Sequence, residues 1–173
     1  MDEWIAGFTT ERWGPQLVVL ASTAYAMLLG GVVGFERELK NRPAGFRTHM
    51  LVAGAAALLV GLGDLIATHF SAQYPEQLLR VDPIRLIEAV VTAVGFLGAG
   101  AIFRRSGDTV SGLTTAASLL MVATIGIAAG LHAQFLALTA TVLTLAVLVI
   151  LAWVERRAGT RRSRDRHAPG ESD

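Results

Sequence analysis

The sequence predicts an all-α membrane protein, a bundle of five transmembrane helices. Five stretches are each long and apolar enough to cross a bilayer, because a hydrocarbon layer about 30 Å thick requires about 20 helical residues. Of the 173 residues, 53% are hydrophobic, and the mean hydropathy is +0.51. These stretches are apolar on every face, whereas a helix on the surface of a soluble protein has one polar face. A polytopic membrane protein is therefore expected.

The predicted spans divide the chain into three parts. Residues 1–16 form an extracytoplasmic segment, and residues 17–154 form the membrane domain. Residues 155–173 are basic with almost nothing apolar to bury, so we expect a disordered cytoplasmic tail there. The five spans are residues 17–35, 50–68, 84–103, 112–130 and 135–154.

The lysines and arginines predict the orientation, because short cytoplasmic loops retain them. Most of the 15 basic residues lie within residues 37–47, 104–105 and 156–166. These segments follow the first, third and fifth spans, so they share one side of the membrane. We therefore expect the N-terminus outside and the C-terminus inside.

The composition argues against several functions. The chain has no cysteine, so it can have no disulfide, no thiolate nucleophile and no cysteine metal site. It carries no phosphate-binding loop and no dinucleotide fingerprint, and its four histidines are scattered. We expect no enzymatic activity, no cofactor and no nucleic-acid partner.

Charged residues at the outer ends of spans two and three form one candidate site. Ionisable residues within spans are costly and are usually paired or functional. Arg85 and Glu88 are three residues apart, on one face, and Asp64 is at nearly the same height. They are either a structural ion pair at the interface or an acidic pocket for a cation such as Mg²⁺, or for a proton. The predicted outer pocket consists of Asp64, Asp82, Arg85 and Glu88, and the identity of any metal is left open.

Two further polar groups lie toward the predicted cytoplasmic side. A charged patch around the end of span one is either an orientation signal or a functional surface; it contains Glu36, Arg37, Glu38, Arg47 and Thr48. In spans three and four, hydroxyls either bond back to their own helix or line a crevice beside the glycines. This crevice comprises Gly95, Phe96, Gly98, Gly100, Gly112, Thr114 and Thr115, with Ser118 following.

Pairs of small residues four positions apart predict close helix packing. In lipid, such pairs let two helix backbones approach within van der Waals contact. The contact is either inside the bundle or between two copies in a homodimer. The pairs are Gly30 with Gly34, Ala53 with Ala57, and Gly126 with Gly130.

Several motifs in series resemble the MgtC/SapB family, over about residues 17–150. The runs that carry the resemblance are Gly34-Phe35-Glu36-Arg37-Glu38, residues 44–52 (AGFRTHMLV), Asp82-Pro83-Ile84-Arg85, residues 94–103 (VGFLGAGAIF) and residues 110–117 (VSGLTTAA). The family pattern falls on Glu36, Arg37, Glu38, Gly45, Arg47, Thr48, Asp82, Arg85, Gly95, Phe96, Gly98, Gly100, Gly112, Thr114 and Thr115.

The resemblance implies a multi-pass protein of the bacterial inner membrane. It links the chain to growth in low magnesium and, in pathogens, to virulence. It also implies a short form that lacks the soluble C-terminal domain of longer members. Our first hypothesis is a non-catalytic regulator that binds a membrane partner such as the ATP synthase or a magnesium transporter. The alternative is a small transporter of Mg²⁺ or protons.

Overall fold

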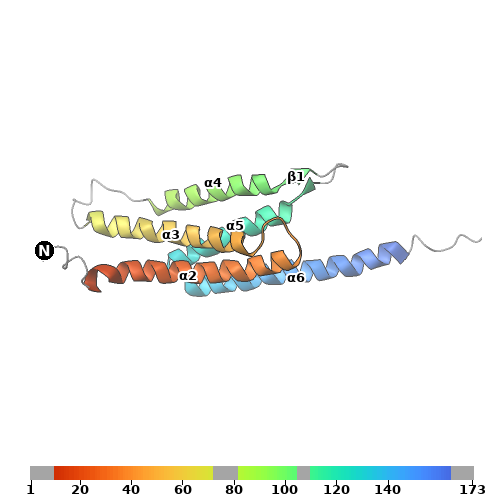
Figure 1. Ribbon diagram of the computed structural model, residues 1–173, viewed down its shortest axis with the longest axis horizontal. Coiled ribbons are helices and arrows are strands. Elements are labelled where there is room, and N and C mark those ends of the chain that lie inside the picture. The colour runs from red at the N-terminus through yellow and green to blue at the C-terminus, as the bar shows by residue number, and fades with distance from the viewer. Residues whose placement is uncertain (1–9, 72–81, 105–109, 165–173) are drawn as a thin grey trace, which may run out of the picture.

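The computed structural model describes residues 10–71, 82–104 and 110–164. Within these ranges the chain forms five helices and one short β-hairpin (Figure 1). The strands of the hairpin are antiparallel, with Phe103 opposite Ser111 and Arg104 opposite Val110. In chain order the elements are α2 (Thr10–Leu39), α3 (Phe46–Ser71), α4 (Pro83–Ala101), β1 (Phe103–Arg104), β2 (Val110–Ser111), α5 (Leu113–Gly130) and α6 (Gln134–Arg164).

Four of these helices are long and apolar enough to cross a membrane. They are Trp13–Leu39 of α2, Phe46–His69 of α3, and the whole of α4 and α5. The apolar part of α6, Gln134–Ile150, is shorter. The prediction of an all-helical membrane bundle is therefore confirmed, while the fifth span and the orientation stay predictions.

Helix α3 packs against both α2 and α5, and small residues bring its backbone close to theirs. A Cβ atom at Gly30 of α2 would lie 2.6 Å from the carbonyl oxygen of His49 in α3. A Cβ atom at Gly126 of α5 would overlap the carbonyl oxygen of Ala53 in α3. The predicted small-residue pairs thus make their close contacts inside the bundle.

The connection between α4 and α5 differs from the sequence prediction. The third span was predicted to reach residue 103, but α4 ends at Ala101, and Ile102 is extended with φ −91° and ψ 121°. Gly112 precedes α5 with φ +96°, and a Cβ atom there would overlap the carbonyl oxygen of Ala101. Only glycine fits this turn, because it tolerates positive φ and adds no Cβ.

Both predicted terminal segments also differ from the structure. Helix α2 begins at Thr10, inside the segment expected to precede the membrane domain. Helix α6 continues to Arg164, although the sequence predicts disorder from residue 155, and it extends well beyond the other helices (Figure 1). The guanidinium of Arg157 lies 3.8 Å from the ring centroid of Trp153, one turn earlier. Such a cation–π contact between successive turns favours the helix. Residues 1–9 and 165–173 lie outside the described residues.

Helix α2 is also joined to the connection between α5 and α6. The hydroxyl of Ser22 lies 3.2 Å from Nδ1 of His132, and the hydroxyl of Tyr25 donates to the carbonyl of Gln134 over 3.3 Å. His132 has φ +60°, which turns the chain from α5 into α6. The first and last helices are therefore held together at the end of the α5–α6 hairpin.

The close approach of α3 and α5 predicts a large effect of one added methyl group. Gly126→Ala forces the two backbones apart, so we expect it to lower the free energy of unfolding by about 1–3 kcal/mol. Gly100→Ala is the matched control, because no atom lies within 4 Å of a Cβ at Gly100. Unfolding in detergent measured by circular dichroism checks this, and equal effects of the two substitutions would contradict the packing described.

Candidate functional site

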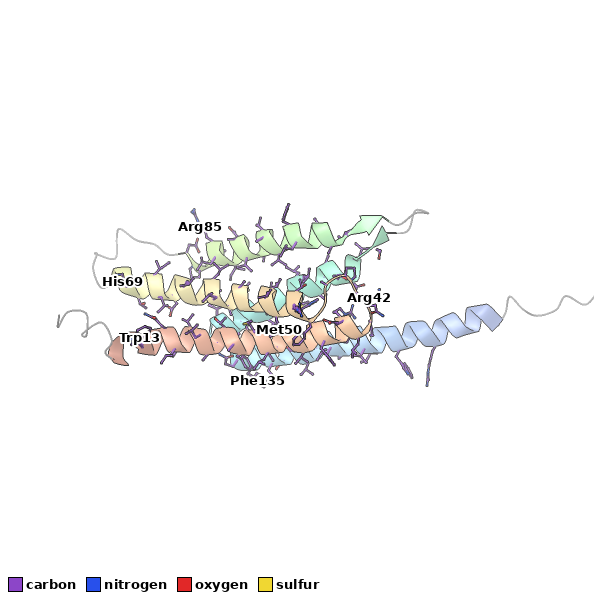
Figure 2. The ribbon with its side chains drawn as sticks, viewed as in Figure 1. Trp13, Arg42, Met50, His69, Arg85 and Phe135 are labelled. Atoms are coloured by element: carbon purple, nitrogen blue, oxygen red, sulfur yellow. The ribbon has the colours of Figure 1, made fainter. Side chains whose placement is uncertain are left out.

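The end of the bundle at which α2 turns into α3 carries Arg37, Lys40 and Arg42, and we call it the basic end. Figure 2 shows Arg42 at this end, opposite to the end that carries Trp13 and His69. Polar side chains from α2, α3 and α5 meet in the interior here. This cluster is the main polar feature of the described interior. A buried polar group is costly unless it is hydrogen-bonded, so each side chain of the cluster needs a partner.

The first part of the cluster is an ion-pair network at the end of α2. The Nε atom of Arg37 donates to Oε2 of Glu36 over 2.5 Å, and the exposed fractions of the two side chains are 3% and 12%. Lys40 forms an ion pair with the other carboxylate oxygen, Oε1. Its ammonium group also donates to the carbonyl of Leu148 in α6, over 3.1 Å. One carboxylate thus connects two cations, and one of them ties α2 to α6.

The turn after α2 is held by Glu38. Its Oε2 atom accepts a hydrogen bond of 2.8 Å from the backbone N–H of Phe46, the first residue of α3. This bond satisfies one of the backbone donors that a helix start leaves free. A Cβ atom at Gly45 would lie 2.7 Å from the same oxygen, so the glycine leaves room for the cap. Glu38 therefore has a structural role at the start of α3.

The second part of the cluster is His49, whose side chain is 0% exposed. Its Nδ1 atom lies 2.9 Å from the carbonyl oxygen of Gly45, and its Nε2 atom lies 3.0 Å from the hydroxyl of Ser118 in α5. That hydroxyl also lies 2.8 Å from the carbonyl oxygen of Thr115. Both ring nitrogens are therefore bonded, and the ring bridges α3 to α5.

This geometry fixes the hydrogen position on one nitrogen of the ring. A carbonyl oxygen only accepts, so Nδ1 of His49 must carry a proton and donate to Gly45. In a neutral ring, Nε2 accepts from Ser118. In a protonated ring, Nε2 donates to Ser118, whose hydroxyl then turns to the carbonyl of Thr115. The charges of Arg37 and Glu36 act on the same ring, which joins the two parts of the cluster.

The structure brings together only part of the predicted cytoplasmic patch. Glu36 and Arg37 are in the buried cluster, whereas Arg47 and Thr48 are exposed. His49 is the functional candidate that the sequence analysis missed. Its position in the motif of residues 44–52, four residues after Gly45 and just inside an apolar span, was the available signal.

The predicted glycine and threonine crevice is divided between two environments. Thr115 is buried and contributes its carbonyl to the cluster, while Thr114 is exposed. Gly98 packs against α5, since a Cβ atom there would lie 3.3 Å from that of Ala116. The remaining members lie elsewhere: Gly95 and Gly100 have no atom near the position of a Cβ, Phe96 is 80% exposed, and Gly112 forms the turn before α5.

The four residues of the predicted outer pocket are all exposed. Asp82 caps α4, because its Oδ1 atom accepts from the backbone N–H of Ile84 over 3.0 Å. No ion pair joins Asp64, Arg85 or Glu88 in the part of the chain that the structure describes. Nor does any group of three acidic or histidine side chains there lie close enough to hold a metal. The structure therefore does not assemble these residues into an enclosed site.

Loss of the Ser118 hydroxyl leaves Nε2 of His49 without a partner in the interior. We expect Ser118→Ala to lower the free energy of unfolding by about 1–3 kcal/mol. Thr124→Ala is the control, because the Thr124 side chain is exposed and its hydroxyl bonds only to the carbonyl of Met121 on its own helix. The comparison is made by denaturant titration in detergent micelles. If Thr124→Ala destabilises as much as Ser118→Ala, the bridge to His49 contributes nothing.

Comparisons with known proteins agree with the motifs. The model of the MgtC family matches residues 23–157. Protein SapB of Bacillus subtilis is 36% identical over 148 residues, which are 86% of this chain and 62% of SapB. Protein MgtC of Brucella abortus is 40% identical over 139 residues, 80% of this chain and 53% of that protein. A protein of Escherichia coli named "Putative magnesium transporter YhiD" is 35% identical over 130 residues, 72% of this chain and 56% of that protein.

This chain therefore spans between about half and two thirds of the length of these relatives. No solved structure matches it. The family match covers the buried cluster, α4 and the small-residue contacts of α2, α3 and α5. The resemblance seen in the sequence motifs is confirmed, and the chain belongs to the MgtC/SapB family.

Proposed function

We propose that this membrane protein is a non-catalytic regulator of the bacterial inner membrane, linked to magnesium limitation or virulence. It acts by binding other membrane proteins, of which the ATP synthase and a magnesium transporter are the candidates implied by the family resemblance. It uses no cofactor and binds no nucleic acid. The observation that carries the proposal is the closed interior of the bundle.

Small residues in α2, α3 and α5 place neighbouring helix backbones in contact along the interior. A Cβ atom at Gly130 would lie 2.8 Å from the carbonyl oxygen of Ala57, and one at Gly34 would lie 2.8 Å from the Cβ of His49. A transported ion needs a path lined by polar groups or water, because charge in an apolar interior is costly. Packing this dense favours a protein that acts through its surface.

The polar groups of the interior also support this proposal. Glu36 is paired with two cations, and both nitrogens of His49 are bonded to groups of the chain itself. Such groups hold helices together and have few bonding positions left for a passing ion. The cluster then serves to keep α2, α3, α5 and α6 in one arrangement.

A small transporter of Mg²⁺ or protons is the second candidate. Two observations favour it: one relative is named "Putative magnesium transporter YhiD", and Asp64 and Glu88 place carboxylates on spanning helices. Carboxylate oxygens are ligands that Mg²⁺ prefers, and with water they form sites that bind it weakly. The two candidates differ in whether the isolated protein moves ions.

Ion flux into liposomes distinguishes them. The wild type, Asp64→Asn and Glu88→Gln are each reconstituted into vesicles that contain magnesium and proton dyes. The helicity of each protein in the vesicles is verified by circular dichroism. We expect flux of both ions equal to that of protein-free vesicles for all three proteins. Flux through the wild type that Glu88→Gln abolishes would overturn the regulator proposal and establish transport at the outer carboxylates. Flux that both variants retain would equally overturn it.

A further inference from the structure

Helix α4 lies at the edge of the bundle and is the least buried of the four spanning helices (Figure 1). It packs mainly against α5 and, to a smaller extent, against α3. Its buried side consists of Val90, Val94 and Gly98. The opposite side has no neighbour in the described part of the chain, so its chemistry indicates what it meets in the membrane.

Apart from Phe96, which is 80% exposed, that opposite side is not composed as a lipid-facing surface. Five exposed residues follow one another at intervals of three and four positions, the spacing that keeps side chains on one helix face. Two are charged, one has a hydroxyl, and two are small, whereas lipid favours large apolar side chains. We call them the α4 stripe: Arg85, Glu88, Thr92, Gly95 and Ala99.

The stripe has two zones that suit a second helix. In the lower zone, toward the C-terminal end of α4, Gly95 and Ala99 have the small-xxx-small spacing that lets helix backbones approach closely in lipid. No atom of this chain lies within 4 Å of a Cβ at Gly95, so the space beside it is open. In the upper zone, at the N-terminal end of α4, Arg85 and Glu88 carry opposite charges one turn apart. Figure 2 shows Arg85 at the start of α4, on the side away from α3.

The opposite charges of the upper zone point to a second copy of the chain. Two α4 helices related by a two-fold axis along the membrane normal run parallel, and the same stripe faces itself. Glu88 of one protomer and Arg85 of its partner are then offset by about 4.5 Å along the helix axes, which these long side chains can span. The symmetry then gives two such ion pairs, and each charge is neutralised. We propose that the α4 stripe is the interface of a homodimer in the membrane.

This inference does not rest on the proposed function, since a dimer is compatible with a regulator and with a transporter. Cross-linking therefore tests it independently of ion flux. The chain has no cysteine, so single cysteines report on single positions. We expect Thr92→Cys and Ala99→Cys to form a disulfide-linked dimer when native membranes are oxidised.

Ala93→Cys is the matched control. Position 93 is also exposed and lies at the depth of Thr92, but it is rotated about 100° around the helix. We expect at least tenfold less dimer from it. Equal cross-linking at positions 92 and 93 would indicate random collision and overturn the proposal. Cross-links from position 99 only to another protein would overturn it in favour of a different partner.

Charge exchange tests the ion pairs, in the Ala99→Cys background. Arg85→Glu makes the upper zone wholly acidic, and Glu88→Arg makes it wholly basic. We therefore expect the amount of cross-linked dimer to fall at least tenfold in each variant alone. Two differently tagged chains, one of each kind, should form a mixed dimer when expressed together, because acidic then faces basic. This recovery also shows that both variants fold.

The chain that carries both changes should dimerise as the wild type does. If only this doubly changed chain recovers and the mixture does not, the charges pair within one protomer and the proposed interface is wrong. Persistence of the dimer in both single variants would contradict it as well.

Discussion

The structure depends on the close contact of α3 with α2 and α5. Lipid supplies no hydrophobic force between helices, so they must be held by close packing and by polar bonds. Gly30 and Gly126 permit that closeness by admitting α3 carbonyl oxygens where a side chain would stand. The hydrogen bond between His49 and Ser118 depends on it too, because this 3.0 Å contact joins α3 directly to α5. The buried cluster is a consequence of the small residues.

Much of this architecture could be predicted from the sequence because its causes are local. Apolar length predicts spans, and small-residue spacing predicts close contact between helices. Glu36 and Arg37 are adjacent in the sequence, so they lie near each other in any fold. The bridge from His49 to Ser118 joins residues 69 positions apart, and no local pattern reveals which helices meet. The hairpin has strands of only two residues, too short for a periodic signal. The outer pocket was predicted on the condition that the second and third spans pack as neighbours. Helices α3 and α4 do pack together, but Asp64 and Glu88 are both exposed, and no local pattern shows how exposed side chains meet.

The polar residues of the described helices fall into two groups with different surroundings. Those near the basic end are bonded to one another and hold the helices in one arrangement. Those on α4, from Arg85 to Thr92, have no such partners on other helices in the described part of the chain, and they lie on the side that is open to the membrane. The close packing of the interior and the exposed polar face of α4 are the observations that support the proposal of a protein acting through contacts with other chains. The chain shares its family with a protein of Escherichia coli that is named "Putative magnesium transporter YhiD".

The closed interior is the central claim, and water access measures it most directly. Val33→Cys in α2 and Val122→Cys in α5 place thiols at positions that are 0% exposed, in a chain with no other cysteine. Leu131→Cys, in the exposed turn between α5 and α6, is the reactive control. A small water-soluble methanethiosulfonate reagent should modify position 131 in membranes and leave positions 33 and 122 unmodified. Modification of either interior cysteine at the rate of position 131 would reveal an aqueous path through the bundle and contradict this account.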